Sequence, residues 1–392
     1  MSKETVFLEQ ISISNLLSLR DVSLPLKQLT VLVGPNASGK SNVLRALALL
    51  RTMTFSEELP PADYIQDRLW AGGAHSIGFQ LQAKVNGTPA AYKLELETKP
   101  ESQVAIEELT TGKVKVIAIQ NGRGQVTDEN DTQVTFFRPP TPKLALKSAG
   151  DYGDKPITSA LTEFIRGWRF YNFKPEEMRR GTIVAQVFKD VQETLSLDNV
   201  GSILGAMLLD WHENDTERFQ SVNEALETCT RLERGLLNND EDGLGLMESY
   251  EKLIPLRWAS DGVFRLMAYQ VLLNQPEIPS LIAIEEPERN LHPAALKDIA
   301  SAIERLSERT QVIITTHSSH LLDAFNPDNL LDSLGVLLLQ NIPGRGTAVT
   351  NIKDARRDRK ALEGWITDFG IGSAIFESEL LQDPTEEQPC IV

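Results

Sequence analysis

The chain has 392 residues and a formal net charge of −16 at pH 7, with 41% hydrophobic and 24% charged residues. Because single cores rarely grow this large, we expect one elaborated domain or two closely packed lobes, with the composition of an ordinary globular protein. The acidic balance excludes a surface that is basic throughout, so any contact with nucleic acid has to come from a local patch.

The sequence carries no recognisable targeting or membrane signal. Its start lacks a basic region followed by an apolar segment, and no apolar run is long enough to cross a bilayer. The two cysteines, Cys229 and Cys390, lie far apart and fit no metal or disulfide framework. We therefore expect a cytoplasmic protein that makes no contact with a membrane.

The first elements in chain order are strands that lead into a glycine-rich loop. Residues 7–26 alternate between apolar and polar side chains, which predicts an antiparallel pair of strands before the strand LTVLV at 29–33. Residues 34–41 read GPNASGKS, and the helix-like run NVLRALALL follows. This octapeptide fits G-x-x-x-x-G-K-[ST] at every fixed position, between the strand and the helix that this phosphate-binding motif requires.

The chemistry of this motif is the binding of a nucleoside triphosphate. A glycine-rich turn lets backbone N–H groups surround phosphate oxygens at a helix N-terminus, where the helix dipole favours negative charge. Lys40 would reach the β- and γ-phosphates, and the Ser41 hydroxyl would be a ligand of Mg²⁺. A chance Gly/Ser/Lys loop is the alternative, which the flanking strand and helix disfavour. The expected nucleotide-binding residues are Gly34, Pro35, Asn36, Ala37, Ser38, Gly39, Lys40, Ser41 and Asn42.

The middle of the chain separates into four stretches. Prolines and glycines predict a loop over 53–75, and strand-like runs with NG and GRG turns predict an antiparallel β subdomain over 76–137. The prolines of 138–156 predict an exposed connector. Residues 157–250 are mostly helical in pattern, including ERFQSVNEALETCTRLERGLL at 217–237. No heptad pattern is sustained, so we expect no long coiled-coil arm.

From residue 253 onward, helices and strands alternate. They are the helix 261–273, the strand 280–286, the helix 294–308, the strand 311–317 and the helix 318–325. This alternation predicts an α/β fold with a mostly parallel sheet and helices on both faces. Two strands, a helix and an acidic tail follow. The predicted domains are a nucleotide-binding core (1–55 and 250–353), the β subdomain (76–137), a helical lobe (157–250) and the C-terminal helix with its tail (354–392).

A pair of carboxylates follows the predicted strand LIAI in the segment LIAIEEPERNLHP. The carboxyl end of such a strand places Glu285 and Glu286 at the sheet edge where doubly wound folds bind ligands. Glu285 would hold Mg²⁺ directly or through water, and Glu286 would orient and polarise the attacking water. An acidic strand end that enters a proline turn is the alternative, and the preceding P-loop makes it the weaker one.

Two shorter signals complete the set. His317 ends the β-branched strand QVIITT about thirty residues after the carboxylates, where a sensor of the γ-phosphate would lie. A lone histidine is more often a surface or core residue, so that alternative stays open. Ser260 and Gly262 begin the helix 261–273 and form a small anion site, although ASDG is also an ordinary N-cap.

Taken in order, these four motifs resemble those of the ABC-type ATPases, in the RecF-, SMC- and OLD-like branch of AAA-type ATPases. GPNASGKSN resembles the Walker A motif including Asn42, ASDGVFRL the signature, EEPERNLHP the Walker B motif with the D-loop, and TTHS the switch histidine. The resemblance covers roughly 1–55 and 250–325. It implies a P-loop NTPase with an ABC-type head, an antiparallel β subdomain and a helical lobe.

The chain departs from this pattern at several positions. Glu285 stands where the branch usually has Asp, and Asp261 stands in place of a signature glycine. The segment FYNFKPEEMRR at 170–180 is similar to one near the Q-loop of RecF-like heads, with Asn172 as a poor candidate for the Q-loop role. The glutamines that remain open for that role are Gln80, Gln82 and Gln186.

The resemblance implies a Mg²⁺-dependent ATPase that works as an ATP-gated homodimer. Ser260 and Gly262 of one subunit would complete the site around a γ-phosphate held by Lys40 of the other. The implied catalytic residues are Lys40, Glu286 and His317, and the implied metal ligands are Ser41 and Glu285. The D-loop residues Asn290 and His292 would lie at the same seam.

Four biological roles compete. An ATP-gated machine that acts on DNA is supported by residues 166–189, which hold six basic and two acidic residues interleaved with aromatic ones; a solvated helix face is the alternative. A second basic cluster lies at 356–360.

The ATPase subunit of a defence or toxin-like assembly with a separate effector protein is the second role. An OLD-type nuclease is rejected because the 75 residues after His317 contain no acidic cluster. A transporter ATPase is disfavoured because about 220 residues separate Gly34 from Ser260.

Overall fold

The structure is a computed structural model with two compact units. Unit 1 comprises Met1–Trp168, Asn329–Arg359 and Glu379–Val392, and unit 2 comprises Arg169–Asp328 and Lys360–Ser378. The residues that the structure describes are 5–72, 74–99, 101–131, 134–137, 142–149, 154–184, 195–230, 236–239, 243–247, 253–330, 332–352, 354, 364, 366 and 368–376.

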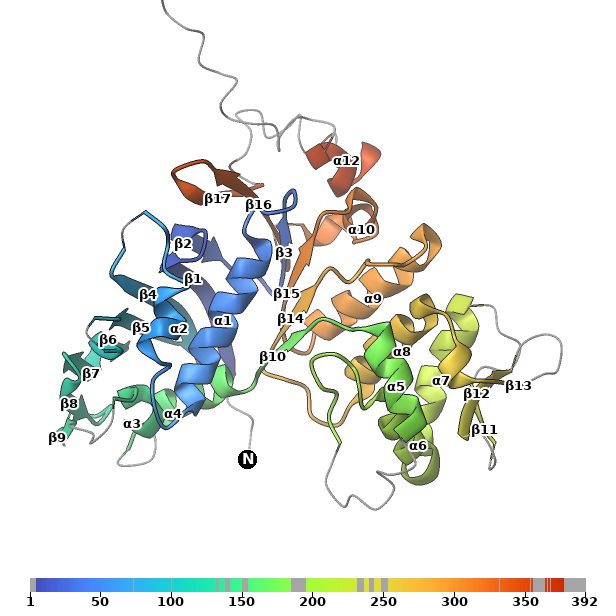
Figure 1. Cartoon of the computed structure of the whole chain (residues 1–392), viewed down its shortest axis with the longest axis horizontal. Helices are drawn as coiled ribbons and strands as arrows, with labels where there is room; N and C mark the ends of the chain where they lie inside the picture. The colour runs from blue at the N-terminus through green and yellow to red at the C-terminus, as the bar shows by residue number, and fades with distance from the viewer. Residues whose placement is uncertain are drawn as a thin grey trace, which may run out of the picture. The chain divides into compact units, whose positions relative to one another are not determined.

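An antiparallel sheet of eight strands dominates unit 1 (Figure 1), in the order β2-β1-β4-β5-β6-β7-β8-β9. Strand β4 pairs with β1, with Ile11 opposite Leu81, so the strands expected over 76–137 continue the sheet of the N-terminal strands. Every second residue along most of β4 is buried, which is the pattern of a sheet with one covered face. The strands are β1 (Val6–Leu16), β2 (Leu19–Pro25), β4 (Ser76–Val85), β5 (Thr88–Glu97), β6 (Gln103–Thr111), β7 (Val114–Gln120), β8 (Arg123–Thr127) and β9 (Val134–Phe137).

The second group of strands in unit 1 carries the glycine-rich loop. Strand β3 (Leu29–Val33) is buried at all five residues and pairs in parallel with β16 (Leu334–Ile342). Strand β17 (Gly346–Asn351) runs antiparallel to β16. Continuous burial marks a strand covered on both faces. The long helix α1 (Lys40–Phe55) follows β3 after the loop, as the sequence predicts.

Carboxylates from the antiparallel sheet cap two helices that follow it in the chain. Glu107 of β6 accepts hydrogen bonds from the first two backbone N–H groups of α3 (Ala145–Ala149), at 2.6 and 2.8 Å. Glu129, just after β8, does the same for two N–H groups of α4 (Pro156–Arg166), at 3.0 and 2.6 Å. These groups would otherwise lack partners inside the helix. The sheet thereby fastens both helices.

The loop expected over 53–75 is wrong in part. Helix α1 continues to Phe55, and a short helix, α2, occupies Ala62–Gln66. The prolines of this stretch do not prevent a single helical turn after Pro61, because proline is tolerated before the first turn of a helix.

Unit 2 contains parallel strands and most of the helices. Strand β14 (Leu281–Glu285) pairs in parallel with β15 (Gln311–Thr316), and β10 (Trp168–Tyr171) is the neighbour of β14. The parallel pairing of β14 and β15, and of β3 and β16, confirms the mostly parallel core. The helices are α5 (Pro175–Val184), α6 (Leu204–Asn214), α7 (Thr216–Thr230), α8 (Asp261–Asn274), α9 (Leu296–Ser307), α10 (Ser319–Asp323) and α12 (Ile371–Phe376).

A small antiparallel sheet corrects the prediction that 217–237 is helical throughout. Helix α7 is assigned only as far as Thr230, and Leu236 already begins a strand. The three strands are β11 (Leu236–Asn239), β12 (Gly243–Met247) and β13 (Leu253–Pro255). A leucine-rich run fits a helix or a short buried strand equally well, and here Leu236, Leu244 and Leu246 are buried. The helix expected after residue 358 lies mostly outside the described residues.

Candidate nucleotide-binding site

The glycine-rich loop has a backbone shape that only glycine permits at two positions. A Cβ atom on Gly34 would lie 2.2 Å from the Leu339 carbonyl oxygen. Gly39 has φ of 105°, and a Cβ there would lie 2.2 Å from Thr347 Oγ1. Ala37 also has a positive φ, 63°, which is costly for a residue with a side chain. The loop therefore makes a tight turn that packs closely against β16 and β17, and glycine permits the tight turn that phosphate binding requires.

Lys40, the first residue of α1, closes this loop. Its ammonium donates hydrogen bonds to the carbonyl oxygens of Gly34 at 2.7 Å and Pro35 at 2.9 Å, and the residue is 5% exposed. The hydroxyl of Ser38 is buried and has no hydrogen-bond partner among the described residues. A buried donor in this position fits an oxygen-rich ligand at the loop, because buried polar groups are otherwise paired. Residues 35–37 are exposed.

Three side chains from outside the motif hold the loop in place. Thr347 Oγ1, at the start of β17, donates to the Ser38 carbonyl at 3.1 Å and lies 2.7 Å from Ser18 Oγ. Asn42 of α1 donates to the same Ser18 hydroxyl at 2.9 Å. Ser18 and Thr347 lie 329 residues apart, and no local pattern in the sequence indicates that they meet at the loop.

In unit 2, the two predicted carboxylates stand at the end of β14. Glu285 lies opposite Thr315 in the register of the parallel pair, and its Oε2 accepts a hydrogen bond from Asn172 Nδ2 at 2.9 Å. Asn172 was a poor candidate in the sequence, yet it is the amide that reaches the predicted metal ligand. The exposed Gln80 and Gln82 lie on β4 in unit 1, and Gln186 lies outside the described residues.

Glu286 and His317 meet directly. The backbone N–H of Glu286 donates to the Thr315 carbonyl at 3.1 Å, and its φ is 44°. This strained turn places Glu286 Oε1 3.3 Å from His317 Nδ1. A second carboxylate, that of Glu288, lies 3.8 Å from the same nitrogen. Parallel pairing thus brings together residues that are about thirty positions apart in the chain.

The signature-like segment forms the start of α8. Ser260 is the N-cap, and its hydroxyl accepts from Val263 N at 3.4 Å. Asp261, which replaces a glycine of the family pattern, pairs with Arg179 at 2.9 Å. Arg179 also donates to the Ala259 carbonyl at 3.1 Å. Trp258 is 72% exposed just before this cap. The aspartate that stands in place of the signature glycine therefore forms an ion pair within unit 2.

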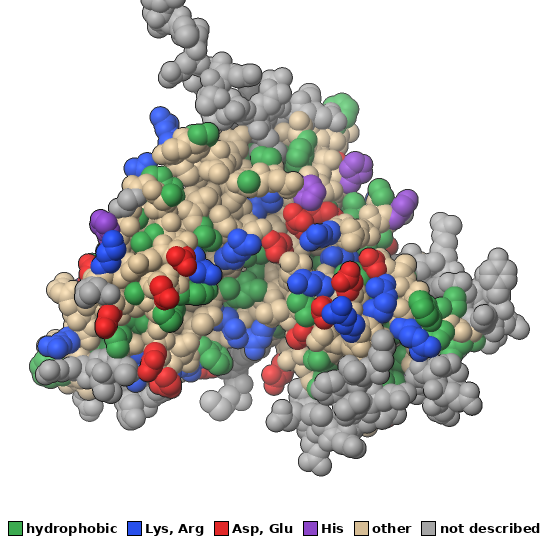
Figure 2. All heavy atoms as spheres, in the orientation of Figure 1, with side chains coloured by type: hydrophobic (Ala, Val, Ile, Leu, Met, Phe, Trp, Pro, Cys, Tyr) green, Lys and Arg blue, Asp and Glu red, His purple; other side chains and the backbone are tan. Residues whose placement is uncertain are grey.

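Part of the basic and aromatic group predicted to bind nucleic acid is used inside the protein, whereas the side chain of Arg180 is 72% exposed and Lys189 lies outside the described residues. Trp168 and Tyr171 are 0% and 2% exposed, so they cannot stack on bases. Arg166 donates to the carbonyl oxygens of Thr54 and Lys147, and Arg180 pairs with Glu177. On the face in Figure 2, basic and acidic side chains are interspersed around α5 and α8. The second cluster, at 356–360, lies outside the described residues.

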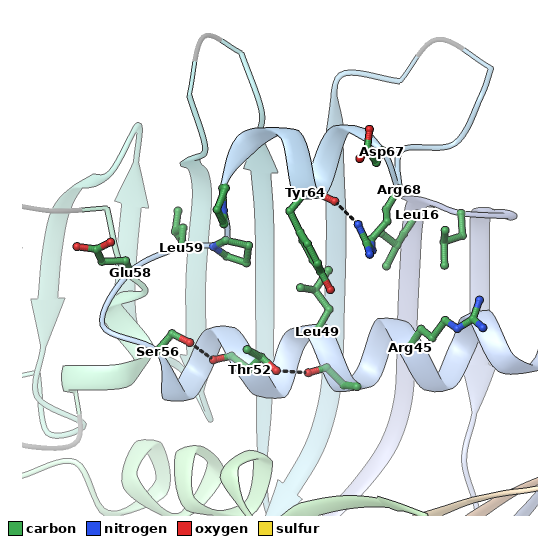
Figure 3. Close-up of a pocket in the computed structure, with 14 residues that line it drawn as sticks. Leu16, Arg45, Leu49, Thr52, Ser56, Glu58, Leu59, Tyr64, Asp67 and Arg68 are labelled. Atoms are coloured by element: carbon green, nitrogen blue, oxygen red, sulfur yellow. Dashed lines mark hydrogen bonds between the residues drawn. The ribbon is translucent and has the colours of Figure 1, made fainter. Parts of the chain in front are cut away.

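A separate cavity of about 920 Å³ lies on the outer face of α1. Tyr64 of α2 extends toward Leu49 of α1 across this cavity, with Arg45 at one end and Glu58 near the other (Figure 3). It contains none of residues 34–42. We therefore do not assign it to phosphate binding.

The side chains predicted to bind a metal suit Mg²⁺ better than an ion that is held entirely by protein ligands. Among the described residues there is no group of three or more His, Cys, Asp and Glu side chains that could hold a metal ion. Mg²⁺ is usually bound by one or two protein oxygens together with waters and substrate phosphates, and the Ser41 hydroxyl and the Glu285 carboxylate are oxygen ligands of that kind. None of the described helices is both long and apolar enough to span a membrane.

Three solved structures that are similar to this chain are heads of SMC proteins. A head bound to the C-winged helix domain of ScpA has a TM-score of 0.50 at 14% identity, covering 88% of this chain and 97% of that one. The SMC head domain from Thermotoga maritima has a TM-score of 0.45 at 13% identity, covering 88% and 98%. A head derived from Pyrococcus furiosus, with an extended coiled coil and bound to the C-terminal domain of ScpA, has 0.49 at 11%, covering 89% and 96%.

No curated protein matches the chain at a significant level. A family model described as "AAA domain, putative AbiEii toxin, Type IV TA system" matches residues 29–323. This range includes the P-loop, the signature-like segment, the carboxylate pair and His317, and the SMC head with a TM-score of 0.50 shares the α/β P-loop fold. The chain belongs to this AAA-domain family and has the fold of an ABC-type, SMC-like P-loop ATPase head.

Proposed function

We propose that this protein binds ATP with Mg²⁺ and hydrolyses it. The observation that carries the proposal is the closed P-loop, in which Lys40 is buried against the carbonyl oxygens of Gly34 and Pro35. The same chain carries a carboxylate and a histidine 3.3 Å apart at the end of a parallel strand pair. Membership of an AAA-domain family supports this pairing of a phosphate loop with a hydrolytic centre.

Each residue has a distinct role in this proposal. The backbone N–H groups of residues 34–42 and the Lys40 ammonium bind the phosphates. Glu286 accepts a proton from water as the water oxygen attacks the γ-phosphorus, and the bond from phosphorus to the ADP oxygen breaks. The products are ADP and inorganic phosphate. His317 donates a hydrogen bond to the γ-phosphate, and Glu286 lies close enough to orient its ring.

Magnesium would be held by the Ser41 hydroxyl and the Glu285 carboxylate. When bound, the ion neutralises charge on the β- and γ-phosphate oxygens. Asn172 orients Glu285 through the 2.9 Å hydrogen bond. We also place Ser260 and Gly262 at the γ-phosphate of a second subunit. The exposed side chains of Asn290 and His292 would lie at that homodimer interface.

The chemical proposal is tested by two substitutions and a control. Glu286→Gln keeps the size of the side chain and removes the base, so ATP binding should persist while turnover falls about a hundredfold or more. Lys40→Ala should abolish binding itself. Glu308→Gln makes the same chemical change on the exposed end of α9 and should leave both unchanged. Hydrolysis at the parental rate by Glu286→Gln would disprove the role of that carboxylate.

The dimer is tested by sedimentation of the Glu286→Gln protein with ATP and Mg²⁺. Nucleotide should convert the monomer into a dimer, or into a larger assembly of dimers. Adding Ser260→Arg should remove that response while leaving ATP binding almost intact, because the signature serves the other subunit. A Glu286→Gln protein that stays monomeric at saturating ATP would overturn the two-subunit mechanism.

For the biological role, the better-supported proposal is the ATPase subunit of a toxin-like assembly with a separate effector. Its support is the family description, which names an AbiEii toxin of a type IV toxin–antitoxin system. A role in DNA maintenance is the second proposal, because SMC heads share the fold. The burial of Trp168 and Tyr171 weakens it, because these two aromatic residues are not accessible to bases.

Expression in a bacterial host separates the two roles. For a toxin-like subunit, the parental chain should arrest growth when its partner is present, and Lys40→Ala should not. For DNA maintenance, duplex or single-stranded DNA should raise the ATPase rate of the purified protein several-fold. Stimulation by DNA without any growth effect would reverse our preference.

A further inference from the structure

The turn after β14 carries a third carboxylate that the proposed chemistry does not use. Glu288 has 7% of its side chain exposed. Glu286, two positions before it, and Asn290, two positions after it, have positive φ angles of 44° and 59°. Hydrogen bonds of 3.1 Å from Arg289 N to the Glu286 carbonyl and from Leu291 N to the Glu288 carbonyl close the turn. Positive φ is uncommon outside glycine, so the fold maintains a costly backbone shape that buries Glu288.

The Glu288 carboxylate binds the end of β15. Its Oε1 accepts a hydrogen bond from Thr316 Oγ1 at 2.6 Å and a longer one from His317 N at 3.3 Å. Thr316 Oγ1 in turn accepts from Ser318 N at 3.0 Å. One carboxylate oxygen therefore connects three consecutive residues, and the middle one is the predicted switch histidine.

The same oxygen also faces the histidine ring. His317 Nδ1 lies 3.8 Å from Glu288 Oε1 and 3.3 Å from Glu286 Oε1. Ionised carboxylates only accept hydrogen bonds, so this arrangement favours the proton on Nδ1. Nε2 is then the nitrogen left for a phosphate oxygen, and it can donate there only when the ring carries both protons.

The second carboxylate oxygen of Glu288 is in a different environment from the first. Oε2 is buried and has no hydrogen-bond partner among the described residues. Burial raises the pKa of Glu288. The buried guanidinium of Arg265, on α8, is near enough to interact with this carboxylate electrostatically, and its own pKa is lowered by burial. A carboxylate that is only half satisfied in the interior costs stability, so stability alone does not account for it.

We propose that Glu288 is a positioning residue that fixes the backbone and the ring of His317 against the turn that carries Glu286. It acts through His317 and touches no reacting atom. Its consequence for turnover rests on the proposed ATP hydrolysis, whereas the positioning itself exists without nucleotide. The two parts can therefore be measured separately.

The positioning is tested by nuclear magnetic resonance of the full chain without nucleotide, with ¹³C and ¹⁵N in its five histidines. The His317 ring signals are identified by their loss in His317→Asn. Glu288→Gln, which keeps the side-chain shape, and Thr316→Val, which removes the bridging hydroxyl, should each shift the His317 signals and leave the others in place. Glu308→Gln, on the exposed end of α9, is the matched control and should shift none.

The consequence for turnover is tested by steady-state kinetics on the same proteins. Glu288→Gln should lower kcat about 10- to 100-fold, the range seen for groups that orient metal-ligating histidines, with KM changed less than about twofold. Thr316→Val should lower kcat by a smaller factor. A structural defect would instead change the binding of ATP as well.

Each result decides one part. His317 signals that are the same in Glu288→Gln, Thr316→Val and the parent would overturn the positioning role. Shifted signals with parental kcat would overturn its link to turnover. A parent that hydrolyses no ATP would refute the proposed function, and the spectra would still decide whether Glu288 positions His317. Should Glu288→Gln fail to fold, Thr316→Val provides the same test.

Discussion

The buried carboxylate of Glu107 makes the stability of unit 1 depend on pH. Its side chain is fully buried in β6, where it accepts hydrogen bonds from Tyr92 Oη at 3.0 Å and from two N–H groups of α3. Burial raises the pKa to about 7 despite these three donors. In the unfolded chain the same group has a pKa of about 4.5, so folding favours the protonated form.

The sign of the effect follows from this pKa difference. A carboxyl group with a raised folded pKa contributes most below its unfolded pKa, and that contribution is lost as the pH rises from about 4.5 to about 7. With these two values, the free energy of unfolding should fall by about 2 to 3 kcal/mol between pH 5 and pH 8 on account of Glu107 alone. Above pH 8 this contribution is nearly constant.

The assay is urea unfolding of the parent and of Glu107→Gln at a series of pH values from 5 to 8. Because glutamine does not titrate, the difference in stability between the two proteins isolates Glu107 from the other carboxylates. Relative to the variant, the parent should lose about 2 to 3 kcal/mol between pH 5 and pH 8. The glutamine side chain has an NH₂ group in place of one carboxylate oxygen, so one of its N–H donors faces a backbone N–H of α3. This contact changes the stability difference between parent and variant by an amount that does not depend on pH.

A control on the same strand guards against a general effect of charge. Glu108 has 35% of its side chain exposed and pairs with Lys115 at 2.6 Å. Glu108→Gln should change stability by less than about 1 kcal/mol at any of these pH values, as for surface ion pairs generally. A stability difference between parent and Glu107→Gln that does not vary with pH would refute the reasoning.

Three further substitutions test other parts of the structure. Gly39→Ala should abolish ATP binding in a fluorescent-nucleotide titration, because φ of 105° and a contact of 2.2 Å to Thr347 Oγ1 leave no room for a methyl group; unchanged affinity would show that the loop can relax. Thr347→Val removes the hydrogen bond to the P-loop backbone and should weaken ATP binding about tenfold by the same titration, whereas unaltered affinity would make the contact incidental. Trp258→Ala should reduce ATP-dependent dimerisation of the Glu286→Gln protein in sedimentation, as expected of an exposed aromatic residue beside the signature. Phe136→Ala, at an 80% exposed site on β9, is the control. Equal effects of the two substitutions would show that Trp258 does not belong to the interface.

Local patterns in the sequence were sufficient for the elements that carry the motifs. A buried strand, a glycine-rich turn and a helix succeed one another within 29–55, and the physical requirements of each are met by neighbouring residues. The strand before Glu285 and the strand before His317 were likewise visible as short runs of apolar and β-branched residues. Their parallel pairing follows from the alternation of strands and helices.

Errors arose where one pattern suits two structures. The leucines before residue 238 fit a helix as well as a strand, and the structure has a strand at Leu236–Asn239. For the basic and aromatic residues of 166–189, the sequence left a nucleic-acid surface and a solvated helix face both open. Trp168 and Tyr171 are buried, because the backbone of β10 directs them into the interior, and composition carries no information about that direction.

The sequence by itself determined the family, the α/β class and the identity of the P-loop, because those features depend on residues adjacent in the chain. Only the tertiary structure revealed that Thr347 and Ser18 hold the loop, that Asn172 reaches Glu285 and that Glu288 binds the end of β15. Hydrogen bonds of this kind join residues tens to hundreds of positions apart. Their partners are selected by strand register and by burial, which act over the folded chain as a whole and leave no local pattern in the order of amino acids.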